Sequence, residues 1–391
     1  MWKRVKQAAL FILRYLEAAL KAVLLAGPVL FLMVYVNYTV DRSGYFQGDQ
    51  FEREVAEALL AGQDLSNYEK MDERQIVRLY VQNLPSDAPL GTVALGSSRI
   101  LQMDRSVADA DAGGFFNAGM IGADVRDVMS TLYLFIREGK APQNVILGID
   151  PWIFSPSPEA LDIRADAELY EEFLSEALGR QSEYDAPDPV EVWDVLLDPA
   201  YFQGNIAWAS RDTGSEEHPI TVAGAELWQQ DTEVKRSDGS VVYTREMRAY
   251  THDEVELLAV EQGGTALRLN DFDALPPDKL ALFDEFIRYG RQNGVNFVFV
   301  LVPYHPLAYY VMSQTQAEQQ CYNGFFAVEP WLREYAAKNH IPLYGSYDAE
   351  SLGLTGEDFY DGLHCKGSGI AKFFPGMHAV LAGQSGTAAL Q

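Results

Sequence analysis

The stretch TVALGSSRI, residues 92–100, is the part of the sequence that most clearly indicates the fold and a candidate site. Its first four residues are small or apolar and predict a buried strand; the Gly96-Ser97-Ser98 run predicts a sharp turn that presents a hydroxyl. In an open α/β sheet, active sites lie outside the carboxyl ends of the strands. A serine there becomes a nucleophile when a base reaches it. The remaining chain must then supply that base.

Strands and helices alternate on both sides of an irregular middle region. Strands spaced by helices of this length are typical of βαβ units and a parallel sheet. Besides 92–95, the sequence predicts strands at 114–118, 144–148, 295–303 and 341–344, and helices at 124–140, 278–293, 330–339 and from Ser368 to the end.

The middle region, residues 151–270, interrupts this alternation and is rich in tryptophan and tyrosine. A hairpin is predicted over Thr232–Thr244, with its turn at Asp238-Gly239. We expect an insertion or cap carried by a catalytic domain of residues 91–391. Its tryptophans have two interpretations, packing within the cap or stacking on sugars.

Composition limits the class of protein. A chain of 391 residues with 48% hydrophobic and 22% charged residues is typical of a globular protein with a sizeable core. The net charge of −26 excludes a nucleic-acid partner, because phosphate binding needs a positive field. No ligand cluster and no phosphate loop occur, so neither a metal nor a cofactor is predicted.

The amino-terminal residues predict a membrane anchor. Residues 1–21 form a basic helix, and residues 22–40 are 19 residues without a charge. As a helix they would span about 28 Å, close to the hydrocarbon thickness of a bilayer. Residues 41–90 then form a helical linker. The basic flank places the amino terminus in the cytoplasm and the catalytic domain in the periplasm or outside the cell, as a single-pass protein of the cytoplasmic membrane.

Two other interpretations of residues 22–40 stay open. One is a cleaved signal peptide, although the lead-in is long and no clear A-x-A site follows the apolar run. The other is a buried core helix, although the length and the basic flank favour the membrane. The two cysteines, Cys321 and Cys365, are too few for a disulfide scaffold. They either pair in an oxidising compartment or remain buried thiols.

A candidate base lies near the carboxyl terminus, in the stretch from Phe359 to Cys365. Asp361 precedes His364 by three residues on a glycine-containing loop before the last predicted helix. One short loop can therefore bring an imidazole to a serine while the carboxylate orients its ring.

Together these segments resemble the SGNH/GDSL hydrolase superfamily, which has a flavodoxin-like three-layer α/β/α sandwich fold. Gly96-Ser97-Ser98 is similar to the family's Gly-Asp-Ser block, so the resemblance makes Ser98 the nucleophile. The run 117–122, NAGMIG, is similar to its Asn-x-Gly-x-x-Gly block. The Asp-x-x-His block is matched by Asp361 and His364. The resemblance covers residues 91–150 and 279–385 and implies that the N–H groups of Ser98 and Gly122 form an oxyanion hole.

One family block is not matched. The family's third block is Gly-x-Asn, whose amide donates to the oxyanion, but here the strand ends Gly148-Ile149-Asp150. An ionised carboxylate cannot donate, and losing one donor costs about 10²–10³ in rate. Asn117 and Arg99 are the candidates to fill the gap. Asp150 is otherwise a cap at the strand end, or a sign of a decayed site.

In these departures from the family pattern, the chain resembles a subset of the superfamily. That subset is the membrane-anchored acyl-transfer proteins of alginate O-acetylation and teichoic-acid D-alanylation. That resemblance implies a serine acyltransferase that acts beside a multispanning membrane acyltransferase and acylates an envelope polysaccharide through a Ser98 ester. The alternatives are an esterase or deacetylase with the same residues, and a non-catalytic scaffold on a decayed fold.

Two further residues have open roles. Arg99 either steers an anionic donor or polymer, or forms a salt bridge where a helix begins. His305, in Pro303-Tyr304-His305-Pro306 at the end of a predicted strand, either contacts substrate or holds a loop.

Overall fold

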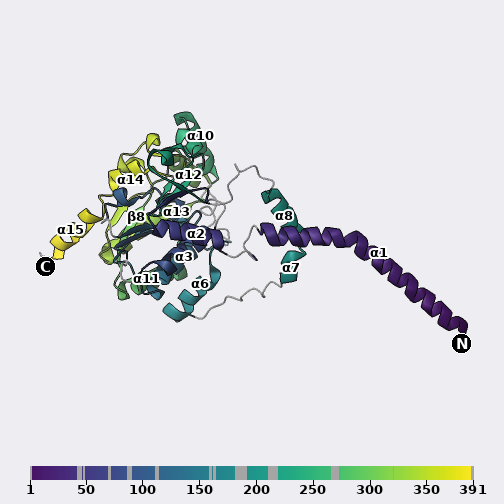
Figure 1. The fold of residues 1–391 in the computed structure, drawn as a ribbon. Coiled ribbons are helices and arrows are strands. Elements are labelled where there is room, and N and C mark those ends of the chain that lie inside the picture. The colour runs from purple at the N-terminus through teal and green to yellow at the C-terminus, as the bar shows by residue number, and fades with distance from the viewer. Residues whose placement is uncertain are drawn as a thin grey trace. The chain divides into compact units, whose positions relative to one another are not determined.

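The structure is a computed structural model. It describes residues 2–41, 46, 49–68, 72–85, 90–110, 114–157, 161, 164–180, 192–209, 219–265, 273–319 and 321–388. By internal contacts the chain divides into two units, residues 1–50 with 185–216, and residues 51–184 with 217–391 (Figure 1).

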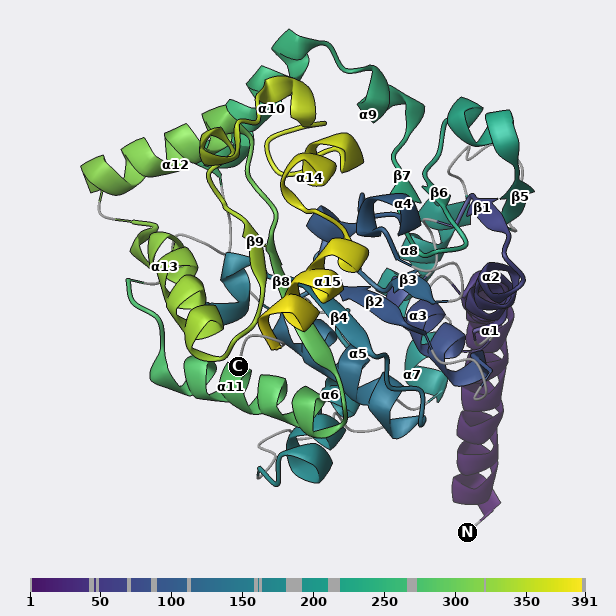
Figure 2. The same ribbon diagram turned by 90° about the vertical axis from the view of Figure 1, so that its left-hand side faces the viewer.

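The larger unit is organised around a five-stranded parallel sheet. Its strands are β2 (Thr92–Leu95), β3 (Phe115–Asn117), β4 (Asn144–Gly148), β8 (Asn296–Leu301) and β9 (Leu343–Gly345). Figure 2 shows them side by side in the order β3, β2, β4, β8, β9, and every adjacent pair is parallel. The sequence predicted a parallel α/β sheet with these five strands, and that prediction is confirmed.

Helices cover both faces of this sheet because consecutive strand residues point to opposite sides. Val93 and Leu95 of β2 pack in one apolar cluster, whereas Ala94 packs in another. The first cluster includes residues of α3 (Glu73–Asn83), α5 (Val125–Arg137), α11 (Pro277–Gln292) and α13 (Asn323–Lys338). The second includes residues of α4 (Arg105–Ala108), α10 (His252–Gly264), α14 (Gly367–Phe373) and α15 (Met377–Ala388).

A second, antiparallel sheet lies in the same unit. It joins β1 (Asp64–Ser66), β5 (Ile220–Val222), β6 (Val234–Lys235) and β7 (Val241–Val242) in the order β5, β1, β6, β7. The hairpin predicted to turn at Asp238-Gly239 is thereby confirmed. The strand β1 was not predicted, because three residues carry little local signal and both pairing partners lie more than 150 residues further along the chain.

Other helix boundaries differ from the prediction. Residues 41–90 were expected to form a helical linker, but the described residues among them include a strand as well as helices: α2 (Gln50–Leu60), β1 and α3. The terminal helix from Ser368 is two helices, α14 and α15, and α13 begins seven residues before the predicted 330. The other helices in the described part of this unit are α6 (Ala167–Glu172), continued by a π-helical turn (Phe173–Ala177), α9 (Arg245–Ala249) and α12 (Pro306–Gln319).

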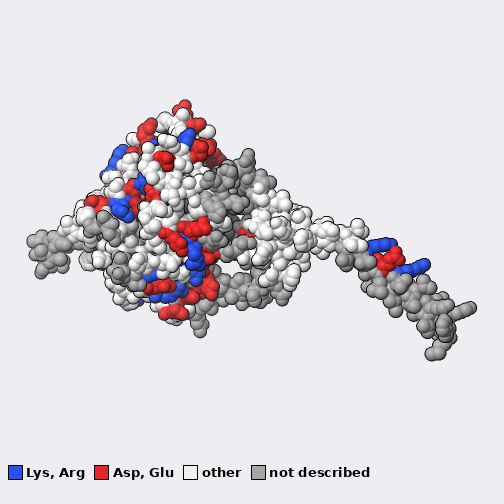
Figure 3. Space-filling model, in the orientation of Figure 1, with Lys and Arg blue, Asp and Glu red and all other residues white. Residues whose placement is uncertain are grey.

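Short 3₁₀ helices also occur in the described residues of the larger unit. They are Ser98–Ile100, Pro151–Phe154, Gly224–Gln229, Glu350–Leu352 and Gly356–Asp358. In Figure 3, acidic side chains gather at the top of the face, over α10, whose sequence carries Asp253, Glu254, Glu256 and Glu261.

The described residues of the smaller unit form the helices α1 (Trp2–Val40), α7 (Val192–Leu196) and α8 (Pro199–Ala209). Asn37 of α1 is buried and donates from Nδ2 to the carbonyls of Val195 and Leu196, each at 3.1 Å. Asn205 of α8 donates to Asn37 Oδ1 at 3.1 Å, and Tyr201 donates to Asp41. Part of the inserted region 151–270 therefore packs on the last turns of α1. Among the described residues, no helix combines the length and hydropathy needed to cross a membrane.

Candidate active site

The candidate site lies where the sheet reverses its winding direction. From β2 the chain moves first to β3 on one side and then to β4 on the other, so the crevice opens between the carboxyl ends of β2 and β4. Gly96 turns the chain after β2 with φ at +151°, a conformation that favours glycine. A Cβ at this position would lie 2.8 Å from the carbonyl oxygen of Gly148 in β4. The serine turn therefore depends on a residue without a side chain.

The structure brings Ser98, His364 and Asp361 together. Ser98 begins a 3₁₀ turn, and its Oγ lies 3.0 Å from His364 Nε2. His364 Nδ1 lies 2.9 Å from Asp361 Oδ2. An ionised carboxylate only accepts, so Nδ1 carries its proton toward Asp361 and Nε2 is left to accept the Ser98 hydroxyl. The expected proximity of serine and base is present across 266 residues of sequence.

The Asp361 carboxylate is held in place by its own loop and by α10. Its Oδ1 accepts the backbone N–H groups of Leu363 and His364, each at 2.8 Å. Gln262 of α10 accepts the N–H of Gly362 at 2.8 Å and donates to Asp361 Oδ2 at 3.4 Å. Burial alone would raise the pKa of Asp361, but the charge of His364, its side-chain hydrogen bond and the backbone N–H groups of Leu363 and His364 outweigh burial and bring the pKa to about 2.

This depressed pKa predicts a defined pH dependence of stability. Because the folded pKa lies below the ordinary value of 3.8, Asp361 stabilises the folded state fully above about pH 4. That contribution, about 2 kcal/mol, is lost as the pH falls through about 2. Urea unfolding of the wild type and Asp361→Asn between pH 5 and pH 2.5 should show the difference between them shrinking as the solution is acidified. A constant difference would contradict this prediction.

Arg99 is not a surface residue that steers anions. It is buried and pairs with Asp150, with Nη1 at 2.9 Å from Oδ1. Its Nε donates to the Leu363 carbonyl at 3.2 Å, and its Nη2 donates to the Val302 carbonyl. The guanidinium also lies 3.7 Å from the centre of the Tyr304 ring. The structure thus favours the salt-bridge interpretation.

Asp150 and Asn117 both have structural partners. Asp150 precedes a 3₁₀ turn without capping it, and its carboxylate instead neutralises Arg99. Asn117 donates from Nδ2 to the carbonyls of Ile100 and Met103, at 2.8 and 3.0 Å, and accepts the N–H of Gly119 at 2.9 Å. These side-chain hydrogen bonds of Asn117 and Arg99 thus go to backbone carbonyls, the Gly119 N–H and Asp150.

The loop 119–122 runs beside the serine turn. Met120 N–H donates to the Gly96 carbonyl at 3.1 Å, and Met120 forms a parallel bridge with Ser97. Gly122 has φ at +67°, in the left-handed region that favours glycine. The loop that carries Gly122 is therefore adjacent to the turn that carries Ser98.

Tyr243 is a site residue that the sequence did not single out. It follows β7, and its hydroxyl donates to the Ser98 carbonyl at 3.2 Å. Its ring meets the His364 ring edge to face at a centroid distance of 5.5 Å. Burial and nearby acids raise the pKa of Tyr243 well above its ordinary value, so the phenol stays protonated. The inserted hairpin thus contributes directly to the site, but no local pattern marks which of its residues does so.

His305 is hydrogen-bonded to the loop that carries His364, the candidate base. Its backbone N–H donates to the Gly362 carbonyl at 3.0 Å, while its ring Nδ1 accepts from Leu307 at 3.1 Å. Burial lowers the pKa of His305 to about 4, so the ring is neutral at pH 7. These contacts favour the loop-holding interpretation over substrate contact.

The two cysteines are free, so the disulfide alternative is wrong for this structure. Cys365 is buried in the cluster that contains Ile370, and Cys321 packs against the cluster on the other face of the sheet. Burial and the nearby Asp358 raise the pKa of the Cys365 thiol to about 12, which keeps it unreactive.

Comparisons with known proteins add no information on the site. The chain has no significant match to a protein-family model, a curated protein or a solved structure. The polar contacts of Ser98, His364 and Asp361 are those of a nucleophile, a general base and an orienting carboxylate.

Proposed function

We propose that the protein is a membrane-anchored serine acyltransferase that acylates a hydroxyl of an envelope polysaccharide outside the cytoplasm. The observation that carries the proposal is the contact chain from Ser98 Oγ through His364 to Asp361. The parallel sheet and its strand order support the three-layer SGNH-like fold that the sequence motifs imply. The choice of transfer over hydrolysis rests on the resemblance to envelope acyl-transfer proteins.

In the first step, His364 Nε2 takes the hydroxyl proton as Ser98 Oγ attacks the acyl carbonyl. The N–H groups of Ser98 and Gly122 hold the oxygen that becomes negative. His364 returns the proton to the leaving group, and an ester remains on Ser98. Asp361 stays ionised and stabilises the imidazolium.

In the second step, a sugar hydroxyl gives its proton to His364 and attacks the ester carbonyl. The tetrahedral intermediate collapses, Ser98 regains its proton from His364, and the acylated sugar leaves. Water in place of the sugar would make the same residues an esterase.

The proposed location follows from the uncharged run 22–40 behind a basic flank. Apolar side chains of α1, including Leu24, Leu25, Val29 and Phe31, are exposed in the structure, as expected of a segment that lipid covers. A multispanning membrane acyltransferase would supply the acyl group from the cytoplasmic side.

The test uses the full chain in detergent with 4-nitrophenyl acetate, with and without envelope oligosaccharides that carry free hydroxyls. We expect a burst of nitrophenolate that matches the enzyme concentration, an acetyl group on Ser98 by mass spectrometry, and acetylated oligosaccharide. Ser98→Ala should show none of these. Turnover to acetate alone, with every oligosaccharide unmodified, would favour an esterase, and nitrophenolate release no faster than that of Ser98→Ala would favour a non-catalytic scaffold.

A further inference from the structure

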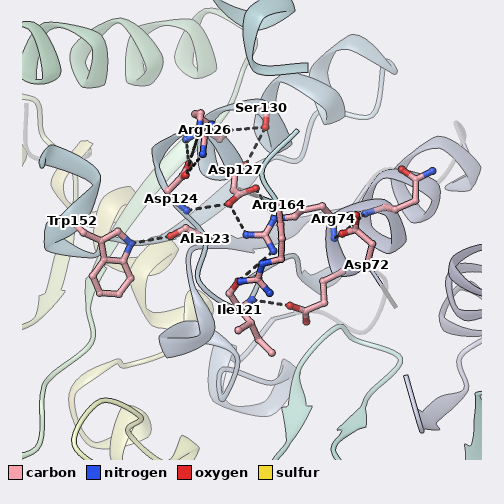
Figure 4. A network of polar contacts seen from close by, with 12 residues as sticks. Asp72, Arg74, Ile121, Ala123, Asp124, Arg126, Asp127, Ser130, Trp152 and Arg164 are labelled. Atoms are coloured by element: carbon pink, nitrogen blue, oxygen red, sulfur yellow. Dashed lines mark hydrogen bonds and ion pairs between the residues drawn. The ribbon is translucent and has the colours of Figure 1, made fainter. Parts of the chain in front are cut away.

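Two arginine side chains bind the peptide unit between Ile121 and Gly122, whose N–H is the candidate oxyanion donor. The carbonyl of Ile121 accepts from Arg74 Nη1 at 3.3 Å and from Arg164 Nη2 at 3.0 Å (Figure 4). This carbonyl and the N–H of Gly122 belong to the same peptide unit, which is trans like every peptide bond in the described residues. In a trans peptide the two groups point in opposite directions. Fixing the carbonyl therefore fixes the direction of the Gly122 N–H.

The backbone N–H of Ile121 is held as well. The N–H of Ile121 donates to Glu73 Oε2 at 2.7 Å. The other oxygen of Glu73 accepts from Lys235 at 3.0 Å, and the Lys235 side chain is completely buried. Glu73 lies in α3 and Lys235 in β6, so two distant segments hold this one residue of the loop.

Arg74 is itself held rigidly. Its Nε and Nη2 bind both oxygens of Asp127, at 3.0 and 2.9 Å, and the two side chains are 6% and 2% exposed. Asp127 also accepts the N–H of Asp124 at 3.1 Å, and Figure 4 shows the Arg74 and Asp127 side chains directed toward each other. A guanidinium bound in a fork has little freedom to leave the Ile121 carbonyl.

We infer that Arg74 and Arg164 are positioning residues that orient and strengthen the Gly122 N–H as an oxyanion donor. Positive donors on an amide carbonyl draw electron density from its nitrogen, so hydrogen bonds in series strengthen one another. The inference rests on the proposed function. It also accounts for how the site could act without the asparagine of the third family block, because a stronger remaining donor offsets part of that loss.

The experiment measures the carbonyl of the acyl-enzyme directly. The full chain is acetylated on Ser98 with 4-nitrophenyl [1-¹³C]acetate, and the ester carbonyl stretch is recorded by isotope-edited infrared difference spectroscopy. In Arg74→Lys and in Arg164→Met we expect the band to move to higher frequency, since weaker hydrogen bonding polarises the carbonyl less. The acylation rate constant should fall about tenfold with little change in KM. This loss is smaller than the loss caused by removing a whole oxyanion donor, because the donor is only weakened.

Arg126→Met is the matched control, because Arg126 pairs with Asp124 in the same network without contacting Ile121. It should leave both the band and the rate unchanged. Arg164 has an exposed contact with the loop, so its variant serves if Arg74→Lys fails to fold. An acyl band that stays in place in the arginine variants overturns the inference alone. The absence of any acyl band in the wild type overturns the proposed function with it.

Discussion

Replacing His364 by glutamine is expected to lower acyl-ester turnover by about 10⁴- to 10⁶-fold while the fold remains intact. In the wild type, Ser98 Oγ lies 3.0 Å from His364 Nε2. Glutamine keeps a polar side chain at this position, but it cannot take up the hydroxyl proton. Nitrophenolate release gives the rate, and circular dichroism with urea unfolding gives the fold. Because serine and base act as one unit, Ser98→Ala/His364→Gln should be no slower than either single variant.

His305→Gln provides the control for this loss. His305 lies after the end of β8 and directly before α12, and its backbone N–H, which the substitution retains, donates to the Gly362 carbonyl in the loop that carries His364. Its turnover should stay within about tenfold of the wild type, the scale of an indirect effect. A His364→Gln enzyme that kept a tenth of the wild-type rate would show that another group serves as the base.

Replacing Arg99 by methionine is expected to lower the free energy of unfolding by about 3–5 kcal/mol. The change leaves Asp150 buried without its counter-charge and removes donors from the carbonyls of Leu363 and Val302. Arg99→Met/Asp150→Leu should recover much of the loss, because it removes the stranded carboxylate as well. Urea unfolding of the four proteins completes the cycle.

The pH dependence of Arg99→Met provides a second check. Burial raises the pKa of Asp150 even in the wild type, where Arg99 and Ser97 oppose the effect. Without Arg99 the folded state binds a proton more readily than the unfolded state, so stability must fall as the pH rises. The deficit relative to the wild type should therefore be larger at pH 8 than at pH 5. A deficit under about 1 kcal/mol at both values would mean that the pair contributes little.

The sequence predicted the central sheet because its strands are marked locally. Strands β2 and β4 are short, buried and mostly apolar, as expected when both faces of a parallel sheet are covered; β4 ends at Gly148, and Gly96 follows β2. The strand β1 escaped prediction because its three residues depend on partners far along the chain. Local pattern determines the first kind of element and tertiary pairing the second.

The candidate site divides in the same way. Ser98, Asp361 and His364 are found from sequence because the turn and the Asp-x-x-His spacing are local motifs. Tyr243 and Arg74 are not, since the contacts of Tyr243 with Ser98 and His364 and of Arg74 with Ile121 exist only after folding. A buried arginine in the sequence looks the same as one on the surface, and Arg99 was open to both interpretations for that reason.

Ser98 and His364 are 266 positions apart in the sequence, so in the proposed enzyme the reactivity of the serine would be a measure of folding. A serine without its base reacts slowly with phosphonate probes, and the base arrives only when the carboxyl-terminal loop has docked on the sheet. No amino-terminal fragment that stops before residue 361 contains the pair. The fraction of chains that a phosphonate labels in increasing urea should therefore fall together with the global unfolding transition, so one covalent label counts native molecules.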